Sequence, residues 1–183
     1  MTGPMMWTVR PETPEDRAAV RAVVAAAFPT PAEADLVDAL RDDAAWVPGL
    51  SMVAEPKDPE PGAAGVAGYA LLTRCRVGGG AALALGPVAV SPWAQGRGAG
   101  GAVVRGVLDV AAARAARGGE RLVVVLGHPE YYPRFGFVRA SSLGVSVAFP
   151  VPDEALMALV LDGPGPVPSG VVAYPAPFGV PGP

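Results

Sequence analysis

The residues best suited to chemistry form a glycine-rich run, Gln95-Gly96-Arg97-Gly98-Ala99-Gly100, between an apolar stretch and a long helical pattern. Glycines allow the backbone to approach a ligand closely, and the first backbone N–H groups of a helix have no partner within that helix. Together with the positive end of the helix dipole, these N–H groups favour a pyrophosphate without any cationic side chain. Such a site suits a chain whose formal net charge is −3.

A dinucleotide site of the Rossmann kind, or a turn merely tightened by glycines, is the alternative interpretation of this run. The Rossmann fingerprint normally follows the first strand of its domain, whereas several expected elements precede residue 95. Glu120 lies near the distance expected for a ribose-binding carboxylate, but it begins an expected strand instead of ending one. Both observations argue against a Rossmann domain.

The elements around the run are predicted from hydrophobic periodicity and from turn residues. Strands are expected at residues 7–10, 51–55, 66–77, 81–90 and 121–126. The strand at 81–90 is apolar on both faces and therefore central, and short turns before it predict an antiparallel meander. A helix at 98–117 should connect it to 121–126 by a right-handed crossover, which makes these two strands parallel.

Helix starts are predicted at two threonines in the N-terminal part. Thr13, followed by a proline and two acids, predicts a cap and a helix to about residue 28. Thr30 and Glu33 have the spacing of a capping box, and Leu40 and Trp46 then indicate the apolar face of a short helix. In the long helix, Arg105 and Asp109 have the spacing of an i,i+4 ion pair.

The C-terminal third is predicted more loosely. A short helix is expected around residues 131–135, with a strand from 137 onward. Residues 145–174 are expected to form further strands around a helical stretch at 153–159. The tail at 175–183 is rich in proline and glycine, and is expected to wrap the surface or to fray.

The glycine-rich run resembles the Gln/Arg-x-x-Gly-x-Gly/Ala signature of the GNAT superfamily of N-acetyltransferases. Residues 127–137, Gly-His-Pro-Glu-Tyr-Tyr-Pro-Arg-Phe-Gly-Phe, resemble the family's Tyr-x-x-x-Gly-Phe element, and the order of the expected elements agrees. The resemblance implies an α/β (α+β) GNAT fold, in which helices flank a mixed, mostly antiparallel sheet that splays before the glycine-rich loop. We expect a single domain over residues 1–183.

The resemblance also implies a cosubstrate, acetyl-CoA, and a role for individual residues. The end of the central strand should bind the pantetheine arm, and the loop should bind the pyrophosphate, with no metal ion required. Tyr132, four residues before Gly136, occupies the position of the family's general acid, although its ring could instead pack under the last strand. The residues implied to bind acetyl-CoA are Val88, Ala89, Val90, Gln95, Gly96, Arg97, Gly98, Ala99 and Gly100.

The general base is open, because the strand at 81–90 lacks the glutamate that many members of the family carry there. His128, the only histidine, has a suitable unperturbed pKa, but it could also cap the short helix or pack against Tyr132. Glu130 is a second candidate, although an acid in a first helical turn is common. Glu33 lies in the loop that usually faces the acceptor, and its capping role is the alternative. Water could also carry the proton.

The expected activity is transfer of an acetyl group to a primary amine of a small acceptor. A non-catalytic acyl-CoA-binding or sensor module of the same fold is the alternative, slightly favoured by the missing strand glutamate. The loops expected to select the acceptor, residues 28–34 and 163–169, are apolar and rich in proline, with no acidic cluster for a polycation. A small, partly apolar amine fits this composition better than an aminoglycoside or a histone-like tail.

Composition bounds the partners and the compartment. A chain with 51% hydrophobic and 17% charged residues can bury a core, and a net charge of −3 gives no broad attraction to nucleic acid or to an anionic membrane. The only cysteine, Cys75, is expected in a strand as a small buried side chain. Without a recognisable signal peptide or membrane span, a cytoplasmic location is expected, and a homodimer is compatible with such a domain.

Overall fold

The structure, a computed structural model, describes residues 5–62 and 64–183, so the start of the expected domain at residues 1–4 lies outside the described residues. Three α-helices are described: α1 (Arg17–Ala27), α2 (Ala32–Arg41) and α3 (Ala99–Ala115). The strands are β1 (Trp7–Pro11), β2 (Trp46–Pro56), β3 (Gly68–Val77), β4 (Gly80–Val90), β5 (Leu122–Leu126), β6 (Val138–Arg139), β7 (Val145–Ser146), β8 (Leu156–Val160) and β9 (Gly170–Ala173).

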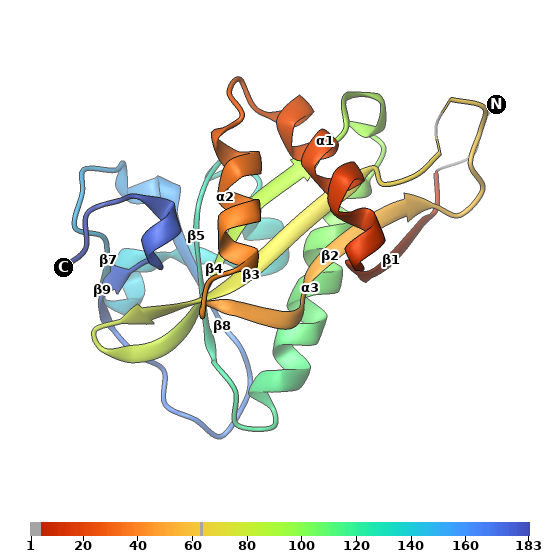
Figure 1. The fold of residues 1–183 in the computed structure, drawn as a ribbon. Coiled ribbons are helices and arrows are strands. Elements are labelled where there is room, and N and C mark those ends of the chain that lie inside the picture. The colour runs from red at the N-terminus through yellow and green to blue at the C-terminus, as the bar shows by residue number, and fades with distance from the viewer. Residues whose placement is uncertain (1–4, 63) are drawn as a thin grey trace.

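The strands form one mixed, mostly antiparallel sheet between two layers of helix. Its order is β1-β2-β3-β4-β5-β8-β6, and β9 pairs with β3 and β7. Helices α1 and α2 cover one face of the sheet, and α3 lies against the other (Figure 1). β4 and β5 are parallel, as expected for strands joined through α3, and the antiparallel meander of β2, β3 and β4 agrees with the prediction.

The sheet opens between β4 and β5. These strands pair only where Leu83–Leu85 meet Val123–Val125, although β4 continues to Val90. On its other side β4 stays paired with β3 as far as Val90, with a register shift between Ala70 and Leu72. Residues 86–90 therefore lack a strand partner on the β5 side within the described chain. The expected splay before the glycine-rich loop is confirmed.

The two predicted helix starts have different outcomes. Thr13 and Asp16 form a capping box before α1, as expected. The capping box predicted at Thr30 and Glu33 is wrong: Pro31 is the N-cap residue of α2, and no side chain caps this helix. Trp46 begins β2 opposite Thr73 instead of ending a helix face. Since Thr30 Oγ1 lies 3.4 Å from the N–H of Ala32, the threonine reaches only the first turn, and the carboxylate of Glu33 is not used as a cap.

The prediction of a helical stretch at residues 153–159 is also wrong. Only Asp153–Ala155 form a 3₁₀ turn, and Leu156–Val160 then form β8, antiparallel to β5. The residues Leu, Met and Ala have high helix propensity, but burial of Leu156 and Met157 against β5 outweighs this local preference. The tail does not fray throughout, because Ala176–Phe178 form a 3₁₀ helix beside α2 (Figure 1).

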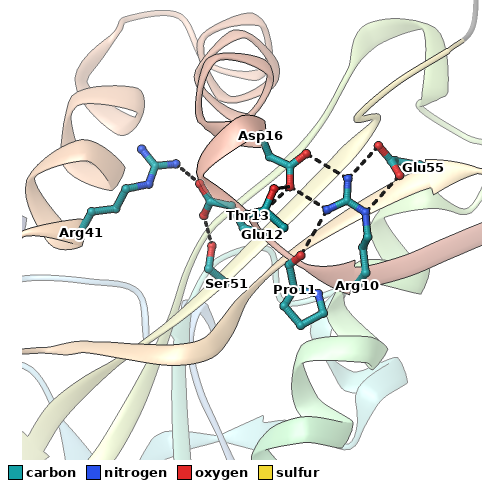
Figure 2. Close-up of polar contacts among 8 residues, drawn as sticks. All are labelled: Arg10, Pro11, Glu12, Thr13, Asp16, Arg41, Ser51 and Glu55. Atoms are coloured by element: carbon teal, nitrogen blue, oxygen red, sulfur yellow. Dashed lines mark hydrogen bonds and ion pairs between the residues drawn. The ribbon is translucent and has the colours of Figure 1, made fainter.

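A network of charged side chains ties α1 and α2 to the first strands (Figure 2). Arg10 of β1 contacts Asp16 at 2.6 Å and Glu55 of β2 at 3.0 Å. Glu12 binds Arg41 at the end of α2 and the hydroxyl of Ser51 in β2, and the side chains of Glu12 and Arg41 are almost completely buried. Because each buried charge has an opposite partner, this network fixes the start of α1 and the end of α2 on the sheet.

No helix in the described part of the chain is both long enough and apolar enough to cross a membrane.

Candidate functional site

The glycine-rich loop is held in place by two side chains. Gly96 and Gly98 have positive φ angles of 71° and 92°, a conformation that residues with a side chain rarely adopt. The indole Nε1 of Trp7 in β1 donates a hydrogen bond to the carbonyl of Arg97 at 2.9 Å. Gln95 Nε2 donates to the carbonyl of Val90 at 3.4 Å. The loop is thus tied both to the end of β4 and to the first strand.

A cavity of about 430 Å³ lies over this loop and the first turn of α3. The first intrahelical bond runs from the N–H of Ala102 to the carbonyl of Gly98, so the amides of the preceding turn remain available to a ligand. The hydroxyl of Tyr131 closes one side, because a Cβ added at Gly100 would lie 2.9 Å from it. The residues predicted to bind acetyl-CoA that line this cavity are Val90, Gln95, Gly96, Gly98, Ala99 and Gly100.

Three other residues predicted to bind acetyl-CoA lie outside the loop cavity. Val88 lines a second cavity, described below. Ala89 is buried against α1, so only its backbone can take part in binding. The side chain of Arg97 is exposed and does not line the cavity, although its carbonyl is bonded to Trp7.

The structure places two cationic side chains, Arg105 and Arg134, at the loop cavity, and the sequence analysis did not predict them there. The predicted Arg105–Asp109 ion pair is not among those formed by the described residues. Instead, Arg105 folds back toward the helix N-terminus, because a Cβ added at Gly101 would lie 3.0 Å from its Nη1 atom. Arg134 lies over the ring of Tyr131, 4.4 Å from the centroid. Gly101, four residues before Arg105, leaves room for the arginine to turn toward the helix start, and this was the available sequence signal. Asp109, four residues after Arg105, has an equally suitable spacing for an ion pair, so the sequence alone did not decide the direction.

Removal of the Arg105 charge should weaken binding of acetyl-CoA. We expect Arg105→Gln to raise the Kd by roughly tenfold, the effect of losing one hydrogen bond to a charged group. The measurement is calorimetric titration at two salt concentrations, and the parent should lose more affinity with salt than the variant. Arg117→Gln, in the exposed turn that follows the same helix, is the matched control and should bind like the parent.

A second cavity, of about 380 Å³, lies at the opening between β4 and β5. The three side chains that were assigned to catalysis or to the acceptor, Tyr132, His128 and Glu33, all line it. They come from a 3₁₀ helix after β5, from the segment directly after β5 and from the first turn of α2, respectively. The structure therefore brings together residues that are almost 100 positions apart in the sequence.

Tyr132 is 8% exposed, in a largely aromatic environment. Its ring meets the rings of Tyr131 and Phe137 edge to face, with centroids 5.1 and 5.7 Å apart. A Cβ on Gly127 would lie 2.5 Å from the Tyr132 ring, so only glycine allows this packing. Burial, and to a smaller extent the neighbouring Tyr131, raises the pKa of Tyr132 to about 12. The phenol thus stays protonated at neutral pH and can act as a donor.

The candidate bases differ in their surroundings. His128 is exposed and lines the second cavity, whereas Glu130 is exposed and lines neither of these two cavities. Glu33 is partly buried, and its Oε2 atom is enclosed with no hydrogen-bond partner among the described residues. Among those residues there is also no group of three or more His, Cys, Asp or Glu side chains that could hold a metal ion.

Glu120, the carboxylate that a Rossmann site would need, has a structural role. It lies just before β5 and forms ion pairs with Arg74 and Arg114, each at 3.3 Å. The mostly antiparallel sheet around it also differs from the parallel sheet of a Rossmann domain.

Cys75 should not contribute to activity. It lies in β3 opposite Ala82 and lines neither of the two cavities, and burial raises the pKa of its thiol to about 12. Because the thiolate is the nucleophilic form, a thiol with so high a pKa is inert at neutral pH. We expect Cys75→Ser to keep the parent kcat and to lose about 1–3 kcal/mol of stability, from burial of a hydroxyl. A folded but inactive Cys75→Ser variant, measured by thiol release, would instead indicate a thiol acyl intermediate.

Comparison with known proteins agrees with this geometry. Residues 18–137 match the model of the acetyltransferase (GNAT) family. An uncharacterized N-acetyltransferase of Escherichia coli K12, YjhQ, is 35% identical over 144 residues, which cover 76% of this chain and 74% of the relative.

Two solved structures share nearly the whole fold. The GNAT family N-acetyltransferase YhbS of Escherichia coli, in complex with CoA, matches with a TM-score of 0.81 and 27% identity over 98% of this chain and 96% of that chain. A GNAT family acetyltransferase of Brucella melitensis, in complex with acetyl-CoA, matches with a TM-score of 0.70 and 32% identity over 95% of this chain and 99% of that chain. These likenesses define the class of the protein as an acyltransferase. The chain belongs to the GNAT family of N-acetyltransferases.

Proposed function

We propose that this protein transfers the acetyl group of acetyl-CoA to the primary amine of a small acceptor. The observation that carries the proposal is a pair of cavities at the open end of β4. Val90 and Tyr131 line the cavity over the helix start, whereas Val88 and Tyr132 line the cavity with the acid and base candidates. Because Val88 and Val90 lie on the same face of the strand, a chain running along β4 passes from one cavity to the other.

Acetyl-CoA fits this arrangement in charge and in shape. The pyrophosphate would accept hydrogen bonds from the first amides of α3, near Arg105 and Arg134, in the cavity of about 430 Å³. The pantetheine amides would pair with the unpaired edge of β4 at residues 86–90, as an added strand does. The acetyl group would then lie beside Tyr132. The complexes that the two solved relatives form with CoA and acetyl-CoA support this placement.

The chemistry needs one proton donor and one proton acceptor. The amine nitrogen attacks the thioester carbonyl, the carbon–sulfur bond breaks, and the products are an amide and the thiol of CoA. Tyr132, protonated at neutral pH, would donate a hydrogen bond or a proton to the departing thiolate. His128 or Glu33, which line the same cavity, would accept the proton that the amine loses, directly or through water. If Tyr132 has transferred its proton to the thiolate, the proton that the amine loses can return to the phenolate and restore the phenol.

Thiol release distinguishes a transferase from a binding module of the same fold. Acetyl-CoA should release thiol faster in the presence of an accepted amine than in its absence. Acetyl-CoA binding without amine-dependent thiol release, across a broad panel of primary amines, would favour the non-catalytic alternative.

A further inference from the structure

Aromatic rings from segments far apart in the sequence form part of the wall of the second cavity. Phe28 follows α1, Phe149 follows β7, and Tyr174 and Phe178 come from the C-terminal segment. The ring centroids of Tyr174 and Phe178 are 5.1 Å apart, and those of Phe149 and Tyr174 are 6.4 Å apart. The C-terminal tail is therefore part of the cavity wall.

One carboxylate lies within these apolar walls. Glu33 lines the cavity, its Oε2 is enclosed without a hydrogen-bond partner, and the capping box that would have used it does not form. No arginine or lysine of the described residues lines the cavity. Glu33 is half-buried, and one oxygen of its carboxylate is withdrawn from water without a partner, so a cationic ligand group beside the carboxylate gains more than it would in solvent. The cavity is thus suited to one positive charge at one place.

The rest of the cavity disfavours a second charge. A further ammonium group against Phe149, Tyr174 or Phe178 would lose its water and meet only rings, whose attraction for a cation, about 0.5–2 kcal/mol, is smaller than the cost of burying an unpaired charge. An apolar body in the same position would bury its surface against the rings. A cavity of about 380 Å³ lies at the small end of the sizes usual for ligand sites.

We propose that the acceptor is a primary monoamine with an apolar body, whose ammonium group binds Glu33 and whose body lies against Phe149, Tyr174 and Phe178. This inference rests on the proposed function, because it assigns the second cavity to the acceptor. The C-terminal segment is then a specificity-determining element. Glu33 binds the acceptor as the ammonium ion, which gives up one proton to Glu33, His128 or water before its nitrogen attacks the thioester.

The test compares two amines of similar length that differ at the far end. 2-Phenylethylamine carries a ring there, whereas 1,5-diaminopentane carries a second ammonium group. With saturating acetyl-CoA, thiol release should show a kcat/KM at least roughly tenfold higher for 2-phenylethylamine, since one uncompensated charge costs 1.4 kcal/mol or more. Glu33→Gln should raise the KM for 2-phenylethylamine by roughly tenfold or more and leave the Kd of acetyl-CoA unchanged. Phe178→Ala should narrow the preference between the two amines.

Two further measurements keep the outcome interpretable. Glu60→Gln, which removes a charge from an exposed turn, is the control and should match the parent in every respect. Calorimetry of 2-phenylethylamine into the protein saturated with CoA measures acceptor binding without catalysis, and Glu33→Gln should weaken it. Equal or better use of the diamine, or unchanged amine binding in Glu33→Gln, would overturn the inference while leaving the proposed function intact. Failure of acetyl-CoA to bind at all would instead remove the proposed function.

Discussion

Tyr132→Phe should lower kcat by roughly 10- to 1000-fold, a range that overlaps the effect of a general acid. The variant keeps the ring and its edge-to-face contacts with Tyr131 and Phe137, so the fold should be preserved. Only the hydroxyl is lost, and with it a donor that is protonated at neutral pH. Because the intact thioester needs this donor much less than the departing thiolate does, the Kd of acetyl-CoA should change little.

The neighbouring tyrosine provides an internal control with a different expected effect. The hydroxyl of Tyr131 lies beside Gly100 in the loop cavity, so Tyr131→Phe should alter the Kd of acetyl-CoA more than kcat. Thiol release and calorimetry on the same preparations separate the two effects. Parent-like kcat in Tyr132→Phe would rule out the acid role and would favour water or a backbone group as the donor.

Gly98→Glu should severely weaken binding of acetyl-CoA. Gly98 precedes the first turn of α3 with a φ of 92°, so any side chain there is strained, and a carboxylate would meet the pyrophosphate. Repulsion between like charges at such short range should raise the Kd by roughly a hundredfold or more. The rise in melting temperature that acetyl-CoA produces in the parent should disappear.

Gly98→Ala separates strain from charge. Its Cβ would lie 3.6 Å from Trp7 Nε1, an ordinary contact, so the variant carries the backbone strain without the carboxylate. It should lose about 1–3 kcal/mol of stability yet retain more affinity than Gly98→Glu. If Gly98→Glu binds acetyl-CoA normally in calorimetry, the phosphate site has been assigned to the wrong loop.

The parts of the fold that local signals determine were predictable. Apolar runs gave β3, β4 and β5, the capping box at Thr13 marked the start of the first helix, and the glycines marked the start of α3. β8 was missed because Leu156–Val160 favour a helix locally, and only their burial against β5 makes them a strand. Pairing between segments 30 residues apart has no local signal in one sequence.

The residues of the candidate site also fall into two groups, those that local sequence motifs indicate and those that only the tertiary structure brings together. The loop at 95–100 and Tyr132 belong to contiguous motifs, so their spacing indicated them. Two other features depend on the tertiary structure. The Arg105 side chain lies near Gly101, and aromatic rings from distant segments, Phe149, Tyr174 and Phe178, line the second cavity. Glu33 shows the limit most clearly, because its spacing from Thr30 indicated a cap, whereas the tertiary structure places it in a cavity.

The most direct test of the central claim is to follow both products of the reaction at once. Acetyl-CoA carrying an isotopic label in its acetyl group is incubated with the protein and 2-phenylethylamine, and the released thiol and the labelled amide are quantified together. The account predicts that thiol and labelled amide appear in equal amounts, and that both depend on the amine and on the hydroxyl of Tyr132. Thiol release without labelled amide, from this amine and from every other primary amine supplied, would contradict acetyl transfer to an amine.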